Sequence, residues 1–527
     1  MIQGSVFKSW VPNWLIILVL IFCMLHSMVL LGVYTSNITY SASFLDVEVE
    51  DLQFSLCVTY GTFLATILIE SRLFKFFPTK KYFVTIYGLA AITFILSAYT
   101  DNFSLFIVLR MAEGVLMALP WIPLRQLLIT RFQSKNAVIL GFTFNYGTLL
   151  LASPFIMNIA VWLLENYDWK YMAYGSAMFQ IICVGLVMLT FNENRFHKKM
   201  PLYQVDWSSY ILVLTAILSG AFVFIYGEKL YWFDSISIKM AIVIAFITGG
   251  LFIIRQMVIK RPCFDMGVFQ FYNLRVGFLL FLIFYISRAT LNICHSTMFS
   301  VWNWEPTRVA HVQYLNVIGN LIGLITAGFI LAKGLASRYA FILGFFLLAV
   351  YHLWFTFLFV PDAALSDIAL PYIIQGIAVG VLFVPLVLFT VSSVPIEYAP
   401  FSGTVGVTGR FWGSTIGFCI MQNAQVFLQN KHYTKLRQSV LWESPETQER
   451  ISQYTNSFMA KGYAIDDAGK LAVKQVLGSL SKQSVLLGNM EIFTTLGYIL
   501  LFLAILLLFN KHLKQTFDIF KNRVWGS

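Results

Sequence analysis

Residues 103–131 read FSLFIVLRMAEGVLMALPWIPLRQLLITR, a run long enough and apolar enough to cross a bilayer as a helix. Arg110 and Glu113 stand near its middle, where a charge costs about 3 kcal/mol on insertion scales. Their i, i+3 spacing places them on one helix face, where they can pair. Two interpretations remain open: a structural ion pair that joins helices, or a polar face on a substrate or proton pathway, where charges within a membrane usually lie.

The composition of the whole chain indicates a membrane protein with many spans. Of its 527 residues, 58% are hydrophobic and only 12% are charged, which excludes a soluble domain. The net charge of +11 does not indicate a nucleic-acid partner, because much of it falls in short loops, where it orients the spans. The six cysteines form no C-x-x-C pair, so we expect no metal site, no disulfide framework and no cofactor.

Apolar windows predict fourteen spans and hence an all-α membrane protein. The windows cover residues 13–35, 52–70, 82–100, 103–130, 137–164, 169–191, 207–227, 235–256, 276–298, 310–332, 339–360, 369–393, 401–428 and 486–510. Basic residues gather in the loops on one side, among them Lys80, Lys198, Arg261 and Lys333. The positive-inside rule therefore predicts that both termini are cytoplasmic, in what we expect to be a bacterial inner membrane.

One predicted external loop, residues 429–484, is much longer than the others. Residues 445–461 are helix-like, Gly462 suits a helix C′ position, and Asp466 or Asp467 suits the N-cap of a second helix. We expect a helical hairpin that either caps the bundle or docks a partner.

The chain also carries an internal repeat with an offset of 262 residues. The offset pairs Gly114 with Gly376, Pro123 with Pro385, Gly141 with Gly403, Gly147 with Gly409, Glu113 with Gln375, and His26 with Arg288. It predicts two six-helix bundles, residues 13–191 and 276–510, with a pair of helices inserted at 207–256 and a cytoplasmic tail at 511–527. Two such parallel halves with a site between them form a transporter architecture.

Several motifs along the chain resemble one family. The fourth span has an R-x-x-Q-G-like pattern at residues 110–114, and the fifth has Ser153-Pro154 in place of a Gly-Pro motif. DWKYM at 168–172, GEKLYWFDS at 227–235 and the glycine-rich run at 403–417 are similar to further family motifs. Together they resemble the fourteen-span drug:proton antiporters of the major facilitator superfamily (the EmrB/QacA type), over essentially the whole chain.

This resemblance implies the major facilitator fold and proton-coupled efflux of small amphiphilic drugs or toxic compounds by alternating access. It also implies a membrane-fusion adaptor of the EmrA/HlyD type as a partner, besides membrane lipid. His26 stands where the family has an acid in its first span, so we expect Glu113, Arg110 and His26 to serve proton coupling. The sequence leaves two alternatives: the same fold exporting a specific metabolite or siderophore, and a multispan membrane transferase. The chain has no G-x-x-x-x-G-K-[ST] nucleotide loop, so ATP does not drive transport from within it.

The remaining candidate residues lie in the second half of the chain. Arg288, Asn292 and His295 are spaced to share one helix face, either bonding to neighbouring helices or lining a central cavity. Arg410 stands among glycines that favour tight helix packing, and we keep a substrate role for it as the alternative. For helix packing and gating we predict the residues Gly114, Pro123, Pro154, Gly376, Pro385, Gly409 and Gly413.

Overall fold

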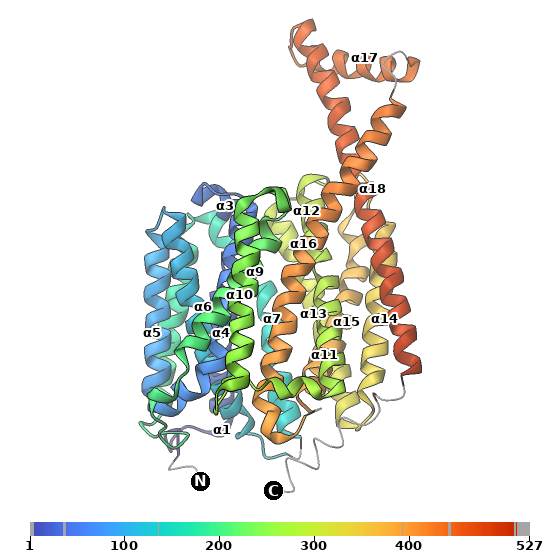
Figure 1. The fold of residues 1–527 in the computed structure, drawn as a ribbon. Coiled ribbons are helices and arrows are strands. Elements are labelled where there is room, and N and C mark those ends of the chain that lie inside the picture. The colour runs from blue at the N-terminus through green and yellow to red at the C-terminus, as the bar shows by residue number, and fades with distance from the viewer. Residues whose placement is uncertain are drawn as a thin grey trace.

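A computed structural model describes residues 5–34, 38–134, 136–392, 394–440, 444–510 and 513 of the chain. The described residues fold into one bundle of long helices, from which a narrower helical projection rises at one end (Figure 1). The predicted cytoplasmic tail, 511–527, lies outside the described residues except for Leu513.

The N-terminal helices form one side of the bundle. They are α1 (Asn13–Met24), α2 (His26–Gly32), α3 (Ile38–Leu45), α4 (Val49–Phe76), α5 (Thr79–Ala98), α6 (Phe103–Ile129), α7 (Ala137–Asn166) and α8 (Lys170–Thr190). Next come the short η1 (Leu202–Gln204), α9 (Trp207–Tyr226), η2 (Trp232–Asp234), α10 (Ile236–Val258) and η3 (Met266–Gln270).

The C-terminal helices form the other side. They are α11 (Tyr272–Arg288), α12 (Thr290–Ser300), α13 (Pro306–Ala332), α14 (Ser337–Thr356), α15 (Leu365–Ser392), η4 (Ile396–Tyr398), α16 (Ala399–Ser439), α17 (Pro445–Ala460) and α18 (Ile465–Phe509). Each of the fourteen predicted spans falls on one of these helices or on a broken pair, so the described residues form the helical bundle that the sequence predicts.

Thirteen spans among the described residues are long and apolar enough to cross a membrane, counting α1 with α2 and α11 with α12 as one span each. The fourteenth predicted span, 401–428, lies in α16, whose many Gly, Ser and Thr residues and Arg410 make it too polar for that criterion. It nevertheless runs through the bundle and beyond it (Figure 1). Burial differs widely between spans, at 78% for α4 and 83% for α15 against 22% for α9 and 17% for α10. The inserted pair α9 and α10 therefore lies on the outside, against lipid.

Two predicted spans are broken where the sequence indicated continuous helices. The span at 13–35 divides at Leu25 into α1 and α2, and the span at 276–298 divides at Ala289 into α11 and α12. The two breaks are related by nearly the same offset as the repeat. Helix starts follow it too, since α6 begins at Phe103 and α15 at Leu365, while α7 begins at Ala137 and α16 at Ala399.

The long loop at 429–484 is mostly helix. α16 has 41 residues and α18 has 45, far more than the roughly 20 that span a bilayer, so both continue past the bundle and carry α17 between them (Figure 1). Gly462 follows α17 with φ at +95°, the left-handed conformation that glycine favours at a helix end. The prediction that Asp466 or Asp467 caps the next helix is wrong: the N-cap is Ala464, and both acids lie in the first turn, where they still favour the positive helix end.

Equivalent glycines bring two helix pairs into close contact. A Cβ atom on Gly114 of α6 would lie 2.4 Å from the Thr59 carbonyl oxygen of α4. One on Gly376 of α15 would lie 2.4 Å from the Asn316 carbonyl oxygen of α13. Both pairs thus pack backbone against backbone, which only glycine allows at this separation.

Candidate functional site

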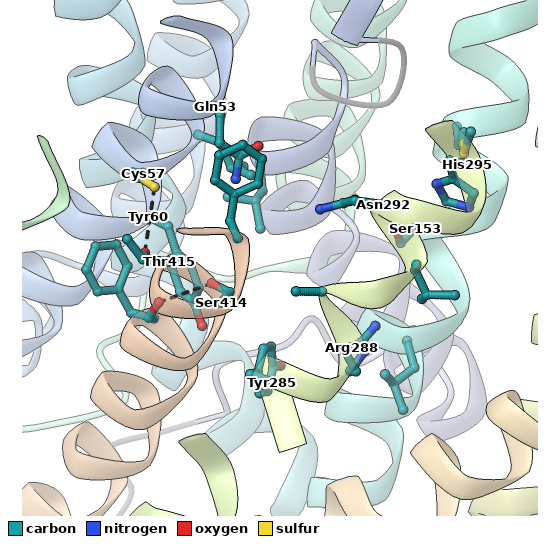
Figure 2. Close-up of a pocket in the computed structure, with 18 of the residues that line it drawn as sticks. Gln53, Cys57, Tyr60, Ser153, Tyr285, Arg288, Asn292, His295, Ser414 and Thr415 are labelled. Atoms are coloured by element: carbon teal, nitrogen blue, oxygen red, sulfur yellow. Dashed lines mark hydrogen bonds between the residues drawn. The ribbon is translucent and has the colours of Figure 1, made fainter. Parts of the chain in front are cut away.

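A cavity of about 380 Å³ lies between the N-terminal and the C-terminal helices. α4 and α16 supply one wall, and α7 with the broken pair α11 and α12 supplies the opposite wall (Figure 2). Its polar lining residues are Gln53, Cys57, Tyr60, Ser153, Tyr285, Arg288, Asn292, His295, Gln313, Asn316, Ser414 and Thr415. Because both halves of the chain contribute, any relative movement of the halves changes the cavity.

Three predicted cavity residues meet here. Arg288, Asn292 and His295 all line the cavity, although the helix break at Ala289 separates the first from the other two (Figure 2). Gln313 of α13 donates a hydrogen bond to His295 Nε2, which fixes the imidazole. Arg288 Nε is buried and has no hydrogen-bond partner among the described residues, so this N–H can serve a ligand.

Arg410 lies at a second, smaller chamber of about 180 Å³. Tyr60, Ser153, Tyr285 and Arg288 line both chambers, so the two adjoin. Arg410 is buried, and its Nε donates to the Gly406 carbonyl oxygen at 3.3 Å. The structure thus places Arg410 and Arg288 at one continuous site. The interpretation of Arg410 as part of a tightly packed, glycine-rich helix contact did not predict this position.

The charged side chains that line this site are positive. Arg288 and Arg410 are its charged lining residues, and neither chamber has an Asp or Glu among the described residues that line it. Aromatic side chains of Tyr60, Phe63 and Trp121 complete the smaller chamber. The site is suited to an anionic molecule with an apolar body.

Arg110 and Glu113 form a fully buried ion pair within α6 and do not line either chamber. Arg110 also donates to the carbonyl oxygens of Leu30 at 2.7 Å and Leu31 at 3.2 Å, where α2 ends. Leu31 lines both chambers, so the pair lies one layer behind the cavity wall. Glu113 Oε1 has no hydrogen-bond partner within the described part of the chain.

His26 lies apart from the cavity. It is fully buried, with Nδ1 2.6 Å from the side-chain amide of Gln180 and Nε2 3.1 Å from the Leu116 carbonyl oxygen. Its ring also packs edge-on against Tyr87 at 4.8 Å. These contacts join α2, α6 and α8.

The other predicted positions lie on helix contacts. Pro123 is inside α6, Pro385 is inside α15, and Pro154 of α7 lines the cavity. A Cβ atom on Gly409 would lie 3.1 Å from Phe278, and one on Gly413 would lie 2.7 Å from the Tyr285 Cβ. Both glycines therefore allow α16 to pack closely against α11, and Gly413 does so at the lining residue Tyr285.

Sequence reasoning missed one buried acid. Glu70 of α4 is 1% exposed, and neither carboxylate oxygen has a hydrogen-bond partner among the residues that the structure describes. The signal was available, since Glu70 ends the apolar run 61–69 within the second span. The repeat paired Gln375 with Glu113 but assigned it no role; in the structure it accepts a hydrogen bond from Asn316, a cavity residue.

Direct bonds join the halves at the cavity wall, where the Cys57 Sγ lies 3.7 Å from the Thr415 Oγ1 (Figure 2), and towards the end that carries the projection. Gln422 donates to Glu50 at 2.8 Å, and Asn158 donates to the Ala310 carbonyl oxygen at 2.9 Å. Towards the other end, Tyr146 of α7 meets Phe383 of α15 with ring centroids 5.3 Å apart. The cavity therefore has a contact between halves on either side of it.

No cluster of three or more possible metal ligands is found among the described residues, and all six cysteines there are free.

Known proteins were compared by sequence. No family model matches the chain. It is 23% identical over 419 residues to the multidrug export protein EmrB of Escherichia coli K12, covering 78% of each protein. It is 22% identical over 454 residues to the protein of the same name in Haemophilus influenzae, covering 84% of each. It is 21% identical over 424 residues to the fatty acid resistance protein FarB of Neisseria gonorrhoeae, covering 78% of this chain and 79% of that protein.

Solved structures agree on the fold. A POT family transporter in complex with 5-aminolevulinic acid superposes with a TM-score of 0.59 at 13% identity, over 94% of this chain and 96% of that one. The human organic anion transporter MFSD10 gives a TM-score of 0.53 at 10% identity, over 94% and 100%. The chain is therefore an integral membrane protein with the major facilitator fold, and its sequence is similar to those of the EmrB multidrug export proteins.

Proposed function

We propose that this chain exports amphiphilic compounds, above all anionic ones, in exchange for protons and by alternating access. The observation that carries the proposal is the cavity lined by both halves, with Arg288 on the wall opposite α4 and α16 (Figure 2). Transporters of this architecture bind substrate between their halves. The EmrB relatives are named for multidrug export, which agrees with a cavity of mixed aromatic and polar lining.

Alternating access requires that the two sets of contacts between halves open in turn. The hydrogen bonds Gln422–Glu50 and Asn158–Ala310 close one end, and the Tyr146–Phe383 contact closes the other. Each of these two hydrogen bonds joins uncharged or singly charged, part-buried groups and has no second bond between the halves beside it among those described. Each is therefore weak enough, at about 1 kcal/mol, to break in a transport cycle.

The substrate class follows from the charge of the site. A carboxylate or phenolate can bind Arg288 Nε, while its apolar body contacts Tyr60, Phe63 and Trp121. A relative named for fatty acid resistance supports the same class, since fatty acids are anionic amphiphiles. A cationic compound would instead meet two arginines with no lining carboxylate among the described residues to offset them.

For proton coupling we propose Glu113 as the carrier, with Arg110 as the competing charge. Protonation of Glu113 would release Arg110 from the ion pair. The hydrogen bonds that Arg110 donates to the carbonyl oxygens of Leu30 and Leu31 would then change. Leu31 lines both chambers, so this change reaches the substrate site through one residue. His26 lines neither chamber, and it contacts the carbonyl oxygen of Leu116, the neighbour of the lining residue Met117.

We also propose a bacterial inner-membrane location with both ends cytoplasmic, from the loop charges, and an adaptor protein bound by the projection. The projection extends well beyond the bundle, as a connection to a second membrane would need (Figure 1).

The test is flux in proteoliposomes with an imposed proton gradient, comparing an anionic, a neutral and a cationic amphiphile of similar size. We expect gradient-driven uptake of the anion to exceed that of the cation. Arg288→Gln should lower uptake of the anion about tenfold and leave the neutral compound within about twofold, because a charge-assisted hydrogen bond contributes about 1.5–3 kcal/mol. Arg308→Gln is the matched control: Arg308 stacks on Trp304 at 3.9 Å and lies outside both chambers.

Equal uptake of anion and cation would refute the substrate class. Uptake of one metabolite or siderophore only would favour the narrower exporter, and absence of flux for every compound would refute the transporter.

A further inference from the structure

A third cavity, of about 460 Å³, opens on the outside of the bundle, between the inserted helices and the C-terminal helices. We call it the lateral crevice. Its lining residues are Leu64, Leu68, Val213, Ala216, Ile217, Gly220, Ala245, Phe246, Gly249, Phe252, Ile253, Phe264, Met266, Phe269, Phe278, Thr404, Val405, Thr408 and Trp412. It is separate from the transport cavity, with which it shares none of these described residues.

The lining is suited to a hydrocarbon chain. Besides the Met266 thioether and the Trp412 indole, its polar side chains are two threonines. Thr408 donates to the Thr404 carbonyl oxygen at 2.9 Å, and Thr404 donates to the Pro400 carbonyl oxygen at 3.5 Å, so both hydroxyls are satisfied within α16. An occupant therefore meets no unpaired hydroxyl there and gains chiefly from burying apolar surface.

The length of the crevice matches one leaflet. The crevice begins at η3, between α10 and α11, and ends at Trp412. Trp412 closes this end because its ring packs on α9 at Gly220, where an added Cβ atom would lie 2.7 Å from the ring. Thr404 and Trp412 lie eight residues apart on α16, or about 12 Å along a helix. Half of a hydrocarbon core is about 15 Å. Phe246 is 78% exposed at the rim, so the crevice is open towards lipid.

Exposed basic residues surround the η3 end. Lys260 and Arg261 precede the lining residue Phe264, and Arg275 lies one turn before Phe278 on α11. Of the nearby acids, Asp206 pairs with Arg255 at 3.0 Å. Asp265 and the exposed Glu397, which precedes Tyr398 beside Gly267, form no ion pair among the described residues, and the three basic residues outnumber them. This end of the crevice is therefore positive, at the depth where lipid headgroups lie.

We infer that the lateral crevice binds an anionic phospholipid of the membrane, with one acyl chain between α10 and α16 and its phosphate at Lys260, Arg261 and Arg275. A lipid in this position would fill the gap between the inserted pair and α16. It would thus hold α9 and α10 against the C-terminal helices. The inference does not depend on the proposed substrate or on proton coupling.

The experiment uses phosphatidylglycerol with a photoactivatable diazirine on its acyl chain, added to the full-length protein in nanodiscs. Mass spectrometry of the cross-linked peptides should place the label on α10 and α16. Gly249→Leu fills the crevice without a backbone clash, because a Cβ atom there would lie 3.8 Å from the Ala216 Cβ, and should lower this labelling at least fivefold. Gly250→Leu is the matched control: its Cβ has open space, it does not line the crevice, and labelling should stay within twofold.

Ala245→Leu, which also fills the crevice, provides a second test if Gly249→Leu does not fold, as judged by size-exclusion chromatography. Changing Lys260, Arg261 and Arg275 together to Gln should remove the preference for phosphatidylglycerol over phosphatidylcholine. Equal labelling of the Gly249 and Gly250 variants, or equal labelling of the native protein by the two lipids, would overturn the inference. Competition by a transported amphiphile but not by unlabelled phosphatidylglycerol would overturn it too, since substrate would then be the occupant.

Discussion

The guanidinium of Arg410 lies over the ring of Tyr146, with Cζ 5.2 Å from the ring centroid. Arg410 belongs to α16 and Tyr146 to α7, so this contact joins the two halves of the chain beside the smaller chamber. Such a cation–π contact contributes about 2 kcal/mol when it is shielded from water. It also holds the charge of Arg410 at the cavity.

The first prediction measures this contact in a double-mutant cycle. Tyr146→Leu and Arg410→Met should show a coupling free energy of about 2 kcal/mol when unfolding is followed in detergent with rising SDS. Tyr146→Phe keeps the ring face and should keep most of the coupling. Additive effects of the two substitutions would mean that the ring and the guanidinium are neighbours without interaction.

A second prediction concerns the close approach of α4 and α6. Gly114→Ala would place a Cβ atom 2.4 Å from the Thr59 carbonyl oxygen, so the helices must separate, at a cost of about 1–3 kcal/mol in stability. Gly88→Ala in α5 is the control, because nothing lies within 4 Å of its added Cβ. Thermal unfolding in detergent compares the two. A loss no greater for Gly114→Ala than for Gly88→Ala would contradict the packing role.

The third prediction concerns the proton carrier and sets Glu113 against Glu70. Glu113→Gln should abolish uptake driven by a pH gradient in everted vesicles and retain gradient-independent substrate exchange. Glu70→Gln should retain both, because Glu70 has no hydrogen bond that leads to the cavity wall among the described residues. Glu113→Asp should retain part of the driven uptake.

The stability of these variants must be measured alongside transport. Glu113→Gln leaves Arg110 buried without its carboxylate, which can cost about 3–5 kcal/mol, although two carbonyl oxygens remain as acceptors. A folded Glu113→Gln variant with full gradient-driven uptake would exclude this carrier. Loss of coupling in Glu70→Gln alone would assign the role to Glu70.

Hydropathy was enough to predict the helices of the bundle, because a long apolar run can be satisfied in lipid only as a helix. It could not predict the breaks at Leu25 and Ala289. Leu25 and Ala289 are neither Gly nor Pro, both residues keep right-handed helical backbone angles, and a window average is insensitive to so local an interruption. The breaks matter, since Arg110 binds carbonyl oxygens at the end of the short α2.

The candidate site was predictable only in part. Arg288, Asn292 and His295 lie in one short segment, so their spacing predicted that their side chains share one helix face. Their partners across the cavity, such as Gln53 and Thr415, come from distant segments and are ordinary polar residues of buried helices. The separation of His26 from the cavity depends on how α2 packs against α8, which periodicity does not specify.

A fourth prediction tests topology with single cysteines in a cysteine-free background. Lys198, in the connection after α8, and Ser457, in α17, are both exposed in the structure, so labelling should depend only on the side of the membrane. In intact spheroplasts, a membrane-impermeant maleimide should label a cysteine at 457 and not one at 198. Labelling in the opposite pattern would invert the proposed orientation.

The last prediction concerns the projection formed by the end of α16, α17 and the start of α18. Ala468 and Ala472 of α18 are fully buried in it, whereas α17 has no buried residue among those described, so the outer surface of α17 is available to a partner.

Deleting residues 444–481 removes α17 and the first part of α18 and leaves the membrane-embedded part of α18 in place. We expect the purified deletion variant to insert and to transport in proteoliposomes within about twofold of the native protein, because the projection contributes no residue to either chamber of the transport cavity. In cells with a double-membrane envelope, the same variant should lower resistance at least fourfold, since substrate would no longer pass to an adaptor. Unchanged resistance together with unchanged flux would show that the projection is only a cap. Loss of flux in proteoliposomes would instead show that the projection supports the transport cycle itself.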